Sequence, residues 1–397
     1  MNSTTPSGKS ANMDATVFDL GGLLRRLATL TDTRGAKGQR FALAPLLLLV
    51  VLAKLSGQNN PSQIADWIKN RASLLLEGLQ LTWKSMPHHN TYRRISQDVV
   101  TPDELDRTVK EHLQSLPGVG RSMLIAFDGK TVRGTIDAES PGGDHLLAAY
   151  LPEEGIVLMQ MAAGDKENEI TVAPKLLKCL DLREKVVAAD AMHTQRSLSI
   201  QILEAGGDYL WFVKDNQPTL REDIEQLFES DDRTVLGGHV PNDFQTCRTV
   251  DKGHGRQETR EITVSSELKG YSDWPGLEQA FKLRRRRLDI KTGKEEIEIV
   301  YGITSLSAAK ASPQRLLYLS RSYWGIENGL HYRRDVTFNE DRTRMTKGNA
   351  GRVMATLNNL VIGLLRQAGA TNIAEARRRC DANFTLAPIA LAAGSIK

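Results

Sequence analysis

The sequence predicts an α/β protein in which a mixed β-sheet carries helices on its faces, with a helical region before it and further helices after it. Three observations lead to this fold class. Residues 16–120 show apolar side chains at helical spacing and no strand pattern of comparable strength. From residue 121, short apolar runs alternate with helical segments. Between about 215 and 310, alternating segments joined by glycine-rich turns indicate a β-rich insertion.

The N-terminal part divides into a tail and a helical region. Residues 1–15 lack a hydrophobic segment, so we expect a flexible tail and no signal peptide. The most apolar run of the helical region contains Pro45 and ends at Lys54, so it is too short to span a membrane and is expected to be a buried helix. Helices are predicted at residues 17–30, 41–56, 61–70 and 101–116, the last with Thr101 as its N-cap.

The central part alternates strands and helices. A strand is predicted to run into Asp128 and turn at Gly129, and a hairpin with the turn PEEG follows it. Helix, strand, helix and strand then follow, which is typical of a mixed sheet. After the insertion the chain returns to helix. We therefore predict a core at residues 121–345 and C-terminal helices at 346–397.

Composition sets few limits on function. The 397 residues include 52 basic and 48 acidic side chains, and this near balance does not by itself indicate nucleic acid as a partner. Cys179, Cys247 and Cys380 lie far apart in sequence, which argues against a disulfide framework or a thiolate zinc site and fits a reducing cytosol.

Three carboxylates form the candidate site. Asp128 and Asp190 end the apolar runs LIAF and VVAA, and neighbouring strands of one sheet can place such ends side by side. Glu327 is expected on a helix, where it shares a face with Leu330, His331 and Arg334. Oxygen ligands suit Mg²⁺, and a third carboxylate allows a second ion. Taken singly, each of the three is more often a turn cap or a solvated residue.

The segments AFDGKTVRGT, VVAADAMHTQ and SYWGIENGLHYRRDVTFNEDRTR together resemble the DDE transposases of bacterial insertion sequences. Within the insertion-sequence-four-like superfamily, the resemblance is to the H-repeat-associated branch and covers nearly the whole chain. It implies a ribonuclease H-like core with a β-rich insertion between the second Asp and the Glu. It also implies that Asp128, Asp190 and Glu327 are catalytic and bind two Mg²⁺ ions, with Mn²⁺ as the alternative.

The resemblance implies a function as well as a fold. An insertion-sequence transposase binds the terminal inverted repeats of its element, cleaves the double-stranded DNA and joins the ends to target DNA. We would expect a homodimer on DNA and no membrane association, in the bacterial cytoplasm and at the nucleoid when bound. Two alternatives stay open: a catalytically silent DNA-binding protein derived from a transposase, and a nuclease without strand transfer.

The chain departs from the superfamily's Tyr, Arg, Glu, Lys signature around the catalytic Glu. Ser320 stands at the Tyr position, Tyr323 at the Arg position and Arg334 at the Lys position. Arg334 keeps the charge and can hold a phosphate through two hydrogen bonds. Arg321 and His331 are candidates to replace the missing contacts.

The remaining candidates for DNA contact are mostly basic, and terminal-repeat recognition is expected in residues 16–120. A solvated surface position is the alternative for several of them, and adjacent arginines on a strand must point to opposite faces. Trp211 and Trp324 are expected in the core, and Asp335, Glu340 and Asp341 are expected to form caps or salt bridges. The full set of candidates for DNA contact is Lys130, Arg133, His193, Lys214, His254, Arg256, Arg284, Arg286, Arg321, His331 and Arg334.

Overall fold

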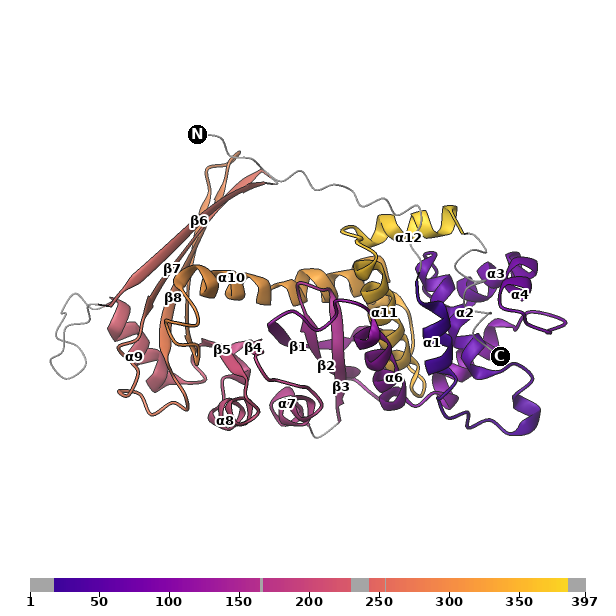
Figure 1. Ribbon diagram of the computed structural model, residues 1–397. Coiled ribbons are helices and arrows are strands. Elements are labelled where there is room, and N and C mark those ends of the chain that lie inside the picture. Colours follow the sequence, from indigo (N-terminus) through magenta and orange to yellow (C-terminus); the bar gives the residue numbers. More distant parts are fainter. Residues whose placement is uncertain (1–17, 165–166, 230–242, 254, 385–397) are drawn as a thin grey trace.

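The computed structural model describes residues 18–164, 167–229, 243–253 and 255–384 (Figure 1). A helical region lies at one side of the molecule, a β-sheet with flanking helices lies in the middle, and a long strand ribbon projects at the other side. We call this ribbon, β6–β9, the arm. The tail predicted at residues 1–15 lies outside the described residues.

The predicted N-terminal helices are all present. The helix predicted at 61–70 begins with Pro61 in its first turn, after Asn60 caps it by accepting a hydrogen bond from the Gln63 amide. Thr101 is the N-cap residue of the last helix, but its side chain makes no capping hydrogen bond. The helices of this region are α1 (Leu20–Leu27), α2 (Leu43–Leu55), α3 (Pro61–Asn70), α4 (Ala72–Gly78), α5 (His89–Arg94) and α6 (Pro102–Ser115).

Helix α2 is a core helix, as its sequence predicts. All but one of its residues are buried. Among the described residues, the stretch Ala36–Leu55 is long and apolar enough to meet the length and composition of a membrane span, but 67% of that window is buried inside the protein. Apolar side chains around the whole circumference of a helix are expected when other helices enclose it.

The strands form one mixed sheet, in the order β3-β2-β1-β4-β5-β9-β8-β7-β6. Strands β1, β4 and β5 are parallel to one another, and the other neighbouring pairs are antiparallel. The first five positions form the ribonuclease H-like core that the resemblance implies. The strands are β1 (Leu124–Val132), β2 (Asp144–Leu151), β3 (Ile156–Ala163), β4 (Val186–Ala189), β5 (Asp208–Val213), β6 (Gln245–Gly253), β7 (Arg256–Ser265), β8 (Gln279–Asp289) and β9 (Glu295–Thr304).

The β-rich insertion extends the core sheet instead of forming a separate one. Residues Leu210–Val213 of β5 pair with Tyr301–Thr304 of β9, so the second half of β9 belongs to the core and its first half to the arm. A glycine is needed at this joint, because a Cβ at Gly302 would lie 2.1 Å from Phe281 Cζ and 2.5 Å from the Trp211 carbonyl oxygen. The insertion also contains a helix that the sequence pattern did not predict, α9 (Pro218–Glu229).

Each face of the sheet has its own hydrophobic core. Alternate residues of β1, such as Leu124 and Ala126, pack with the helices of the N-terminal and C-terminal regions. The intervening residues Ile125 and Phe127 pack on the opposite face with the helices that connect the core strands. Those helices are α7 (Glu169–Lys178) and α8 (Arg196–Glu204), which lie below the sheet in Figure 1.

The C-terminal helices connect the sheet to the helical region. Lys54 of α2 donates to Asn358 Oδ1 (2.6 Å), and Asn358 donates to Glu340 Oε2 (2.8 Å). Arg377 donates to the carbonyl oxygen of Lys54 (2.8 Å). These buried contacts cross the domain boundaries expected at 120 and 345. The division into domains at those positions stays a prediction. The C-terminal helices are α10 (Pro313–Tyr323), α11 (Ala350–Gln367) and α12 (Ile373–Ala382).

Candidate active site

Asp128 and Asp190 lie on adjacent parallel strands. The register pairs Phe127 of β1 with Ala189 of β4, and each aspartate is the next residue along its strand. Leu124 and Ala126 of β1 belong to the core that contacts α10, so Asp128 points to that same side of the sheet. Strand β1 continues to Val132, so the turn predicted at Gly129 is wrong and Asp128 lies within the strand. The parallel register still brings Asp128 beside Asp190, as expected.

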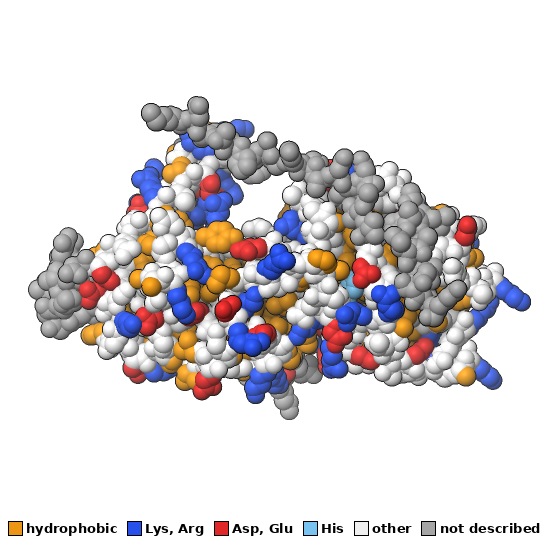
Figure 2. Space-filling model, in the orientation of Figure 1, with side chains coloured by type: hydrophobic (Ala, Val, Ile, Leu, Met, Phe, Trp, Pro, Cys, Tyr) orange, Lys and Arg blue, Asp and Glu red, His pale blue; other side chains and the backbone are white. Residues whose placement is uncertain are grey.

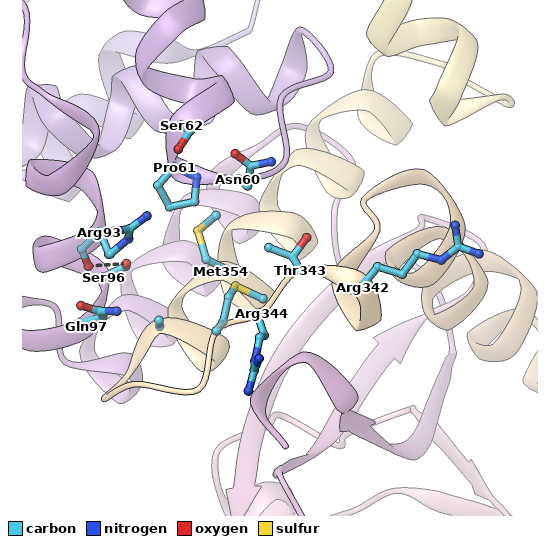
Figure 3. Close-up of a pocket in the computed structure, with 12 residues that line it drawn as sticks. Asn60, Pro61, Ser62, Arg93, Ser96, Gln97, Arg342, Thr343, Arg344 and Met354 are labelled. Carbon is cyan, nitrogen blue, oxygen red and sulfur yellow. Dashed lines mark hydrogen bonds between the residues drawn. The ribbon is translucent and has the colours of Figure 1, made fainter. Parts of the chain in front are cut away.

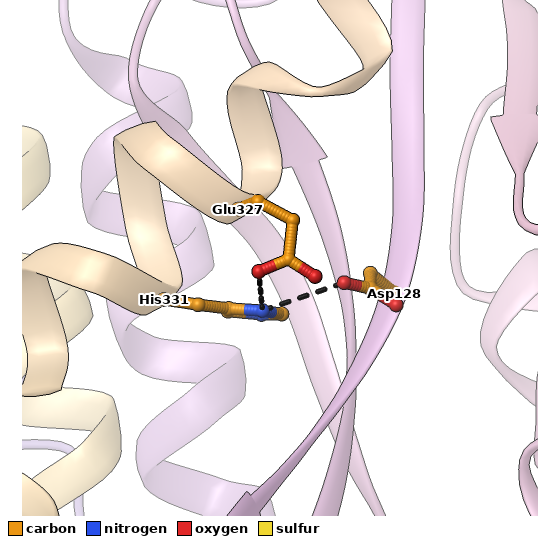
Figure 4. A group of neighbouring side chains, drawn as sticks. All are labelled: Asp128, Glu327 and His331. Atoms are coloured by element: carbon orange, nitrogen blue, oxygen red, sulfur yellow. Dashed lines mark ion pairs between the residues drawn. The ribbon is translucent and has the colours of Figure 1, made fainter. Parts of the chain in front are cut away.

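Glu327 reaches the same place from the segment after α10. This segment, Glu327–His331, is a single π-helical turn, a feature that is frequent at functional sites. His331 Nδ1 lies 3.4 Å from Asp128 Oδ2 and 3.7 Å from Glu327 Oε2 (Figure 4). One ligand atom from each of these three side chains lies within 4.8 Å of the others. We call Asp128, Glu327 and His331 the first acidic group.

In the first acidic group, Asp128 is mostly buried, whereas the neighbouring Glu327 carboxylate is about half exposed. Burial, and after it the negative charge of Glu327, raises the pKa of Asp128 to about 8. The pKa of Glu327 is lowered, chiefly by its hydrogen bond with His331. Burial lowers the pKa of His331, so His331 is a poor source of positive charge at neutral pH. Asp128 and Glu327 therefore share one proton unless a bound cation replaces that proton.

The donor set fits a divalent cation. In the described part of the chain, no Lys or Arg forms an ion pair with Asp128 or Glu327, whose one ion-pair neighbour is His331. Carboxylate oxygens are the ligands that Mg²⁺ prefers, and imidazole nitrogen is better suited to transition metals such as Mn²⁺. The Asp128 carboxylate, which is costly to ionise beside Glu327, would be stabilised when a bound cation replaces its proton.

Asp190 is close to this group, but its carboxylate forms an ion pair with a lysine. Its Oδ1 lies 3.1 Å from Lys214 Nζ, and the carboxylate of Asp190 is about half exposed. Asp190 is not among the three residues whose ligand atoms meet. Burial, and after it the negative charges of Asp128, Asp190 and Glu327, raises the pKa of the buried Tyr323. All three carboxylates therefore act electrostatically on this one side chain.

A second layer of polar residues lies beside Asp128, and of its members only His193 was predicted from the sequence. His145 Nε2 lies 2.8 Å from Glu169 Oε1, and His193 Nε2 lies 3.0 Å from Glu169 Oε2. Burial alone would raise the pKa of Glu169, but hydrogen bonds from His145 and His193 lower it to about 2. A Cβ at Gly129 would lie 2.2 Å from Glu169 Oε1, so a side chain at the position after Asp128 would displace the Glu169 carboxylate. Nothing in the local sequence distinguishes Glu169 from any other first-turn glutamate.

Four candidates for DNA contact are enclosed by protein, which corrects their predicted role. Lys130 is 8% exposed and pairs with Asp335 (2.6 Å) and Asp341 (3.4 Å). Arg334 has no exposed surface, and its Nη2 lies 2.7 Å from Glu340 Oε1. The remaining two are buried, His193 against Glu169 and His331 against the first acidic group. The acidic partners of Lys130 and Arg334 lie in one short segment, where salt bridges were expected.

Two further expectations concern residues near Glu327. Trp211 is fully buried, as predicted, but Trp324 is exposed, with the Arg285 guanidinium 4.8 Å from its ring centroid. Ser320 and Tyr323, which stand at the Tyr and Arg positions of the superfamily signature, are both buried. Neither is therefore placed to touch a phosphate in this structure.

The other candidates for DNA contact lie at the surface. Arg284 and Arg286 share one face of the arm, and Arg285 and Arg287 point to the other, as the strand geometry requires. Figure 2 shows lysine and arginine side chains gathered on the upper part of the arm. His254 lies outside the described residues. The candidates with substantial exposure are Arg133, Lys214, Arg256, Arg284, Arg286 and Arg321.

Two sequence families match the chain. The family described as Transposase DDE domain matches residues 120–364, and the family described as DDE_Tnp_1-associated matches residues 24–113. The chain is 30% identical over 354 residues to "Putative transposase YncI" of Escherichia coli O157:H7, covering 87% of each sequence. It is 27% identical over 353 residues to "H repeat-associated putative transposase YhhI" of Escherichia coli strain K12, covering 88% of this chain and 91% of that protein.

One solved structure aligns with most of the chain. The chain aligns with "Cryo-EM structure of piggyBac transposase synaptic complex with hairpin DNA (SNHP)" at a TM-score of 0.41 and 12% identity, covering 96% of this chain and 79% of that one.

Proposed function

The chain belongs to the Transposase DDE domain family, and from that premise we propose that it is an insertion-sequence transposase whose active site is Asp128, Asp190 and Glu327. It would cleave DNA at the terminal inverted repeats of its element and join the ends to target DNA. One observation carries the proposal. Two carboxylates from distant parts of the chain, Asp128 and Glu327, meet beside the strand end that bears Asp190, with no lysine or arginine of the described chain between them.

The chain's own residues divide the work of the site. Asp128 and Glu327 would hold the cations, and Asp190 completes the set once its half-exposed carboxylate leaves Lys214. Two Mg²⁺ ions, or Mn²⁺ in their place, would supply positive charge for in-line phosphoryl transfer. His331 would fix the two carboxylates that it contacts. Glu169 would act as a positioning residue, since it lies against Gly129 and holds His193, three residues after Asp190.

Double-stranded DNA would approach from the exposed side of this site. We assign phosphate contacts to the exposed arginines of the arm and to Arg133, and we leave out Lys130, His193 and Arg334, which are enclosed. Terminal-repeat recognition is assigned to the helical region at 16–120, and a homodimer on DNA would hold two ends together. A soluble, cytoplasmic protein fits this family, with association to the nucleoid when DNA is bound.

The test is cleavage and joining of labelled DNA that carries the element's ends. In Mg²⁺, the full chain should nick the ends and join them to a supercoiled plasmid. Asp128→Asn and Glu327→Gln should each lower the rate by at least about 10³-fold while DNA binding is retained. Asp335→Asn is the matched control, because Asp335 is a nearby acid that already pairs with Lys130, and its rate should stay within a few-fold of the unmodified protein.

Three results would redirect the proposal. Cleavage without joining would favour the nuclease, and binding without cleavage would favour the silent DNA-binding protein. Full activity of Asp128→Asn or Glu327→Gln would contradict the assignment of that residue.

A further inference from the structure

A pocket lies at the seam between the helical region and the core, outside the first acidic group. Its volume is about 320 Å³, and one wall comes from the start of α3 and the end of α5, with Pro61 and Arg93 (Figure 3). The opposite wall is the segment before α11, with Arg342 and Arg344, and the start of α11 itself, with Met354. We call this the seam pocket.

The lining of the seam pocket is positively charged. Arg93, Arg342 and Arg344 are all exposed, and none of the described residues that line the pocket is an Asp or a Glu. Arg93 makes only a long hydrogen bond to Asn90 Oδ1 (3.4 Å), and no ion pair with a carboxylate is formed by the three guanidinium groups in the described chain. The N-terminus of α3, ten residues long, adds a further partial positive charge.

The three guanidinium groups do not converge on one point. Figure 3 shows Arg93 on the wall of the helical region, Arg344 pointing away from it on the core wall, and Arg342 extending towards the strands. Separate positive groups on different walls of an open pocket suit an extended polyanion better than one small anion. Arginine binds phosphate oxygens through two hydrogen bonds, so successive phosphates of a nucleic-acid backbone match this arrangement.

The segment that carries Arg342 and Arg344 is tied to the strand that carries Asp128. The Met345 amide donates to the Gly134 carbonyl oxygen (2.8 Å), and Gly134 follows the end of β1 by two residues. The Arg133 amide donates to Asp341 Oδ1 (3.2 Å), next to Arg342 in the chain. Exposed arginines therefore continue from the end of β1 to the seam.

We propose that the seam pocket binds the phosphate backbone of duplex DNA where it passes from the active site to the helical region. This inference rests on the proposed function, which supplies the DNA, and adds a binding site that neither the carboxylates nor the arm contains.

The experiment compares two double variants that remove the same charge. Arg93→Ala/Arg344→Ala removes two lining residues, and Arg94→Ala/Lys347→Ala removes two exposed neighbours on the same segments that do not line the pocket. Binding of a fluorescent 40-base-pair duplex is measured in EDTA between 50 and 200 mM salt. A lost phosphate contact reduces the slope of log K against log salt by about one, so the pocket variant should lose about two. The control variant should lose much less.

The outcomes separate this proposal from the one on which it rests. Charge-preserving Arg93→Lys/Arg344→Lys should restore most of the slope, and all variants should keep the melting temperature of the unmodified protein. Equal slopes for the pocket and control variants would overturn the seam pocket, while cleavage by the unmodified protein would leave the transposase proposal standing. Failure of the unmodified protein to bind or cleave DNA would overturn both.

Discussion

Two acidic groups in this molecule look alike in composition and differ in what neutralises them. The first is Asp128, Glu327 and His331, and the second consists of Asp335, Glu340 and Asp341; in each, the candidate ligand atoms lie within 4.8 Å of one another. The second group contains its own cations, since Lys130 pairs with Asp335 and Asp341, and Arg334 pairs with Glu340. The first group has only a buried histidine.

The pKa directions express this difference. Glu340 is fully buried, and burial alone would raise its pKa, yet the adjacent Arg334 brings its pKa below the ordinary value. Asp128 is less deeply buried, but without a cation its pKa rises to about 8. Burial alone therefore does not identify a metal site. The proposed metal site differs from the second group because the protein provides no lysine or arginine ion pair for its acids in the described part of the chain.

The largest expected effect comes from removing the carboxylate that neutralises Arg334 in the second group. Glu340→Gln would leave Arg334 buried without a counter-charge, which costs about 3–5 kcal/mol. Thermal unfolding should show a fall in melting temperature of many degrees. Asp341→Asn, which removes a more exposed acid of the same group, should change stability by less than about 1 kcal/mol. An unchanged melting temperature for Glu340→Gln would mean that the second group is not held by its ion pair.

Adding the missing cation should have the next largest effect. Mg²⁺ at 100 times its dissociation constant would stabilise the folded protein by about 2.7 kcal/mol. The rise in melting temperature should disappear in Asp128→Asn and in Glu327→Gln and persist in Asp335→Asn. An equal rise in all three variants would show that the ion binds elsewhere.

A smaller effect is expected when the repulsion in the first group is removed without metal. The pKa of Asp128 is raised from 3.8 to about 8, so its contribution to stability is present at pH 4 and is lost as the pH rises towards 8. Asp128→Asn cannot ionise there, and in EDTA it should be more stable than the unmodified protein at pH 8. At pH 4 the two should agree, and a gain that is independent of pH would contradict this explanation.

The smallest effect concerns Asp106, a buried carboxyl that belongs to neither group. It accepts hydrogen bonds from Thr356 (2.7 Å) and Gln160 (3.0 Å), and burial raises its pKa to about 7. Its stabilising contribution is therefore lost between about pH 4 and pH 7. Asp106→Asn keeps an acceptor oxygen, so its melting temperature should exceed that of the unmodified protein at pH 8 and equal it at pH 4. Added Mg²⁺ should not change this difference.

The two strands that carry the aspartates were predictable from sequence because an apolar run followed by an acid is typical of a buried strand, although β1 continues past Asp128 to Val132. That pattern gives Asp128 and Asp190, and parallel pairing of β1 with β4 then brings them side by side. The pattern does not reveal that Asp190 is held by Lys214, because that contact depends on where β5 ends.

The enclosed cations were not predictable in the same way. Lys130 and Arg334 look like phosphate ligands because they flank the catalytic motifs, but their partners lie in the segment 335–341. Whether that segment folds back over them depends on π-helical turns, which have no clear sequence signal. The pairing of β5 with β9, which joins the insertion to the core, was not predicted for a related reason. The sequence of one strand alone does not determine which strand it pairs with.

The pairing of β5 with β9 has a mechanical consequence. Strand β9 runs without interruption from the arm into the core, so arm and core share one continuous strand. The arm is joined to the core sheet at β5. The residue directly after β5 is Lys214, which forms an ion pair with Asp190. Under the proposed function, a displacement of the arm would reach Lys214 through this pairing, and the Asp190 carboxylate through Lys214.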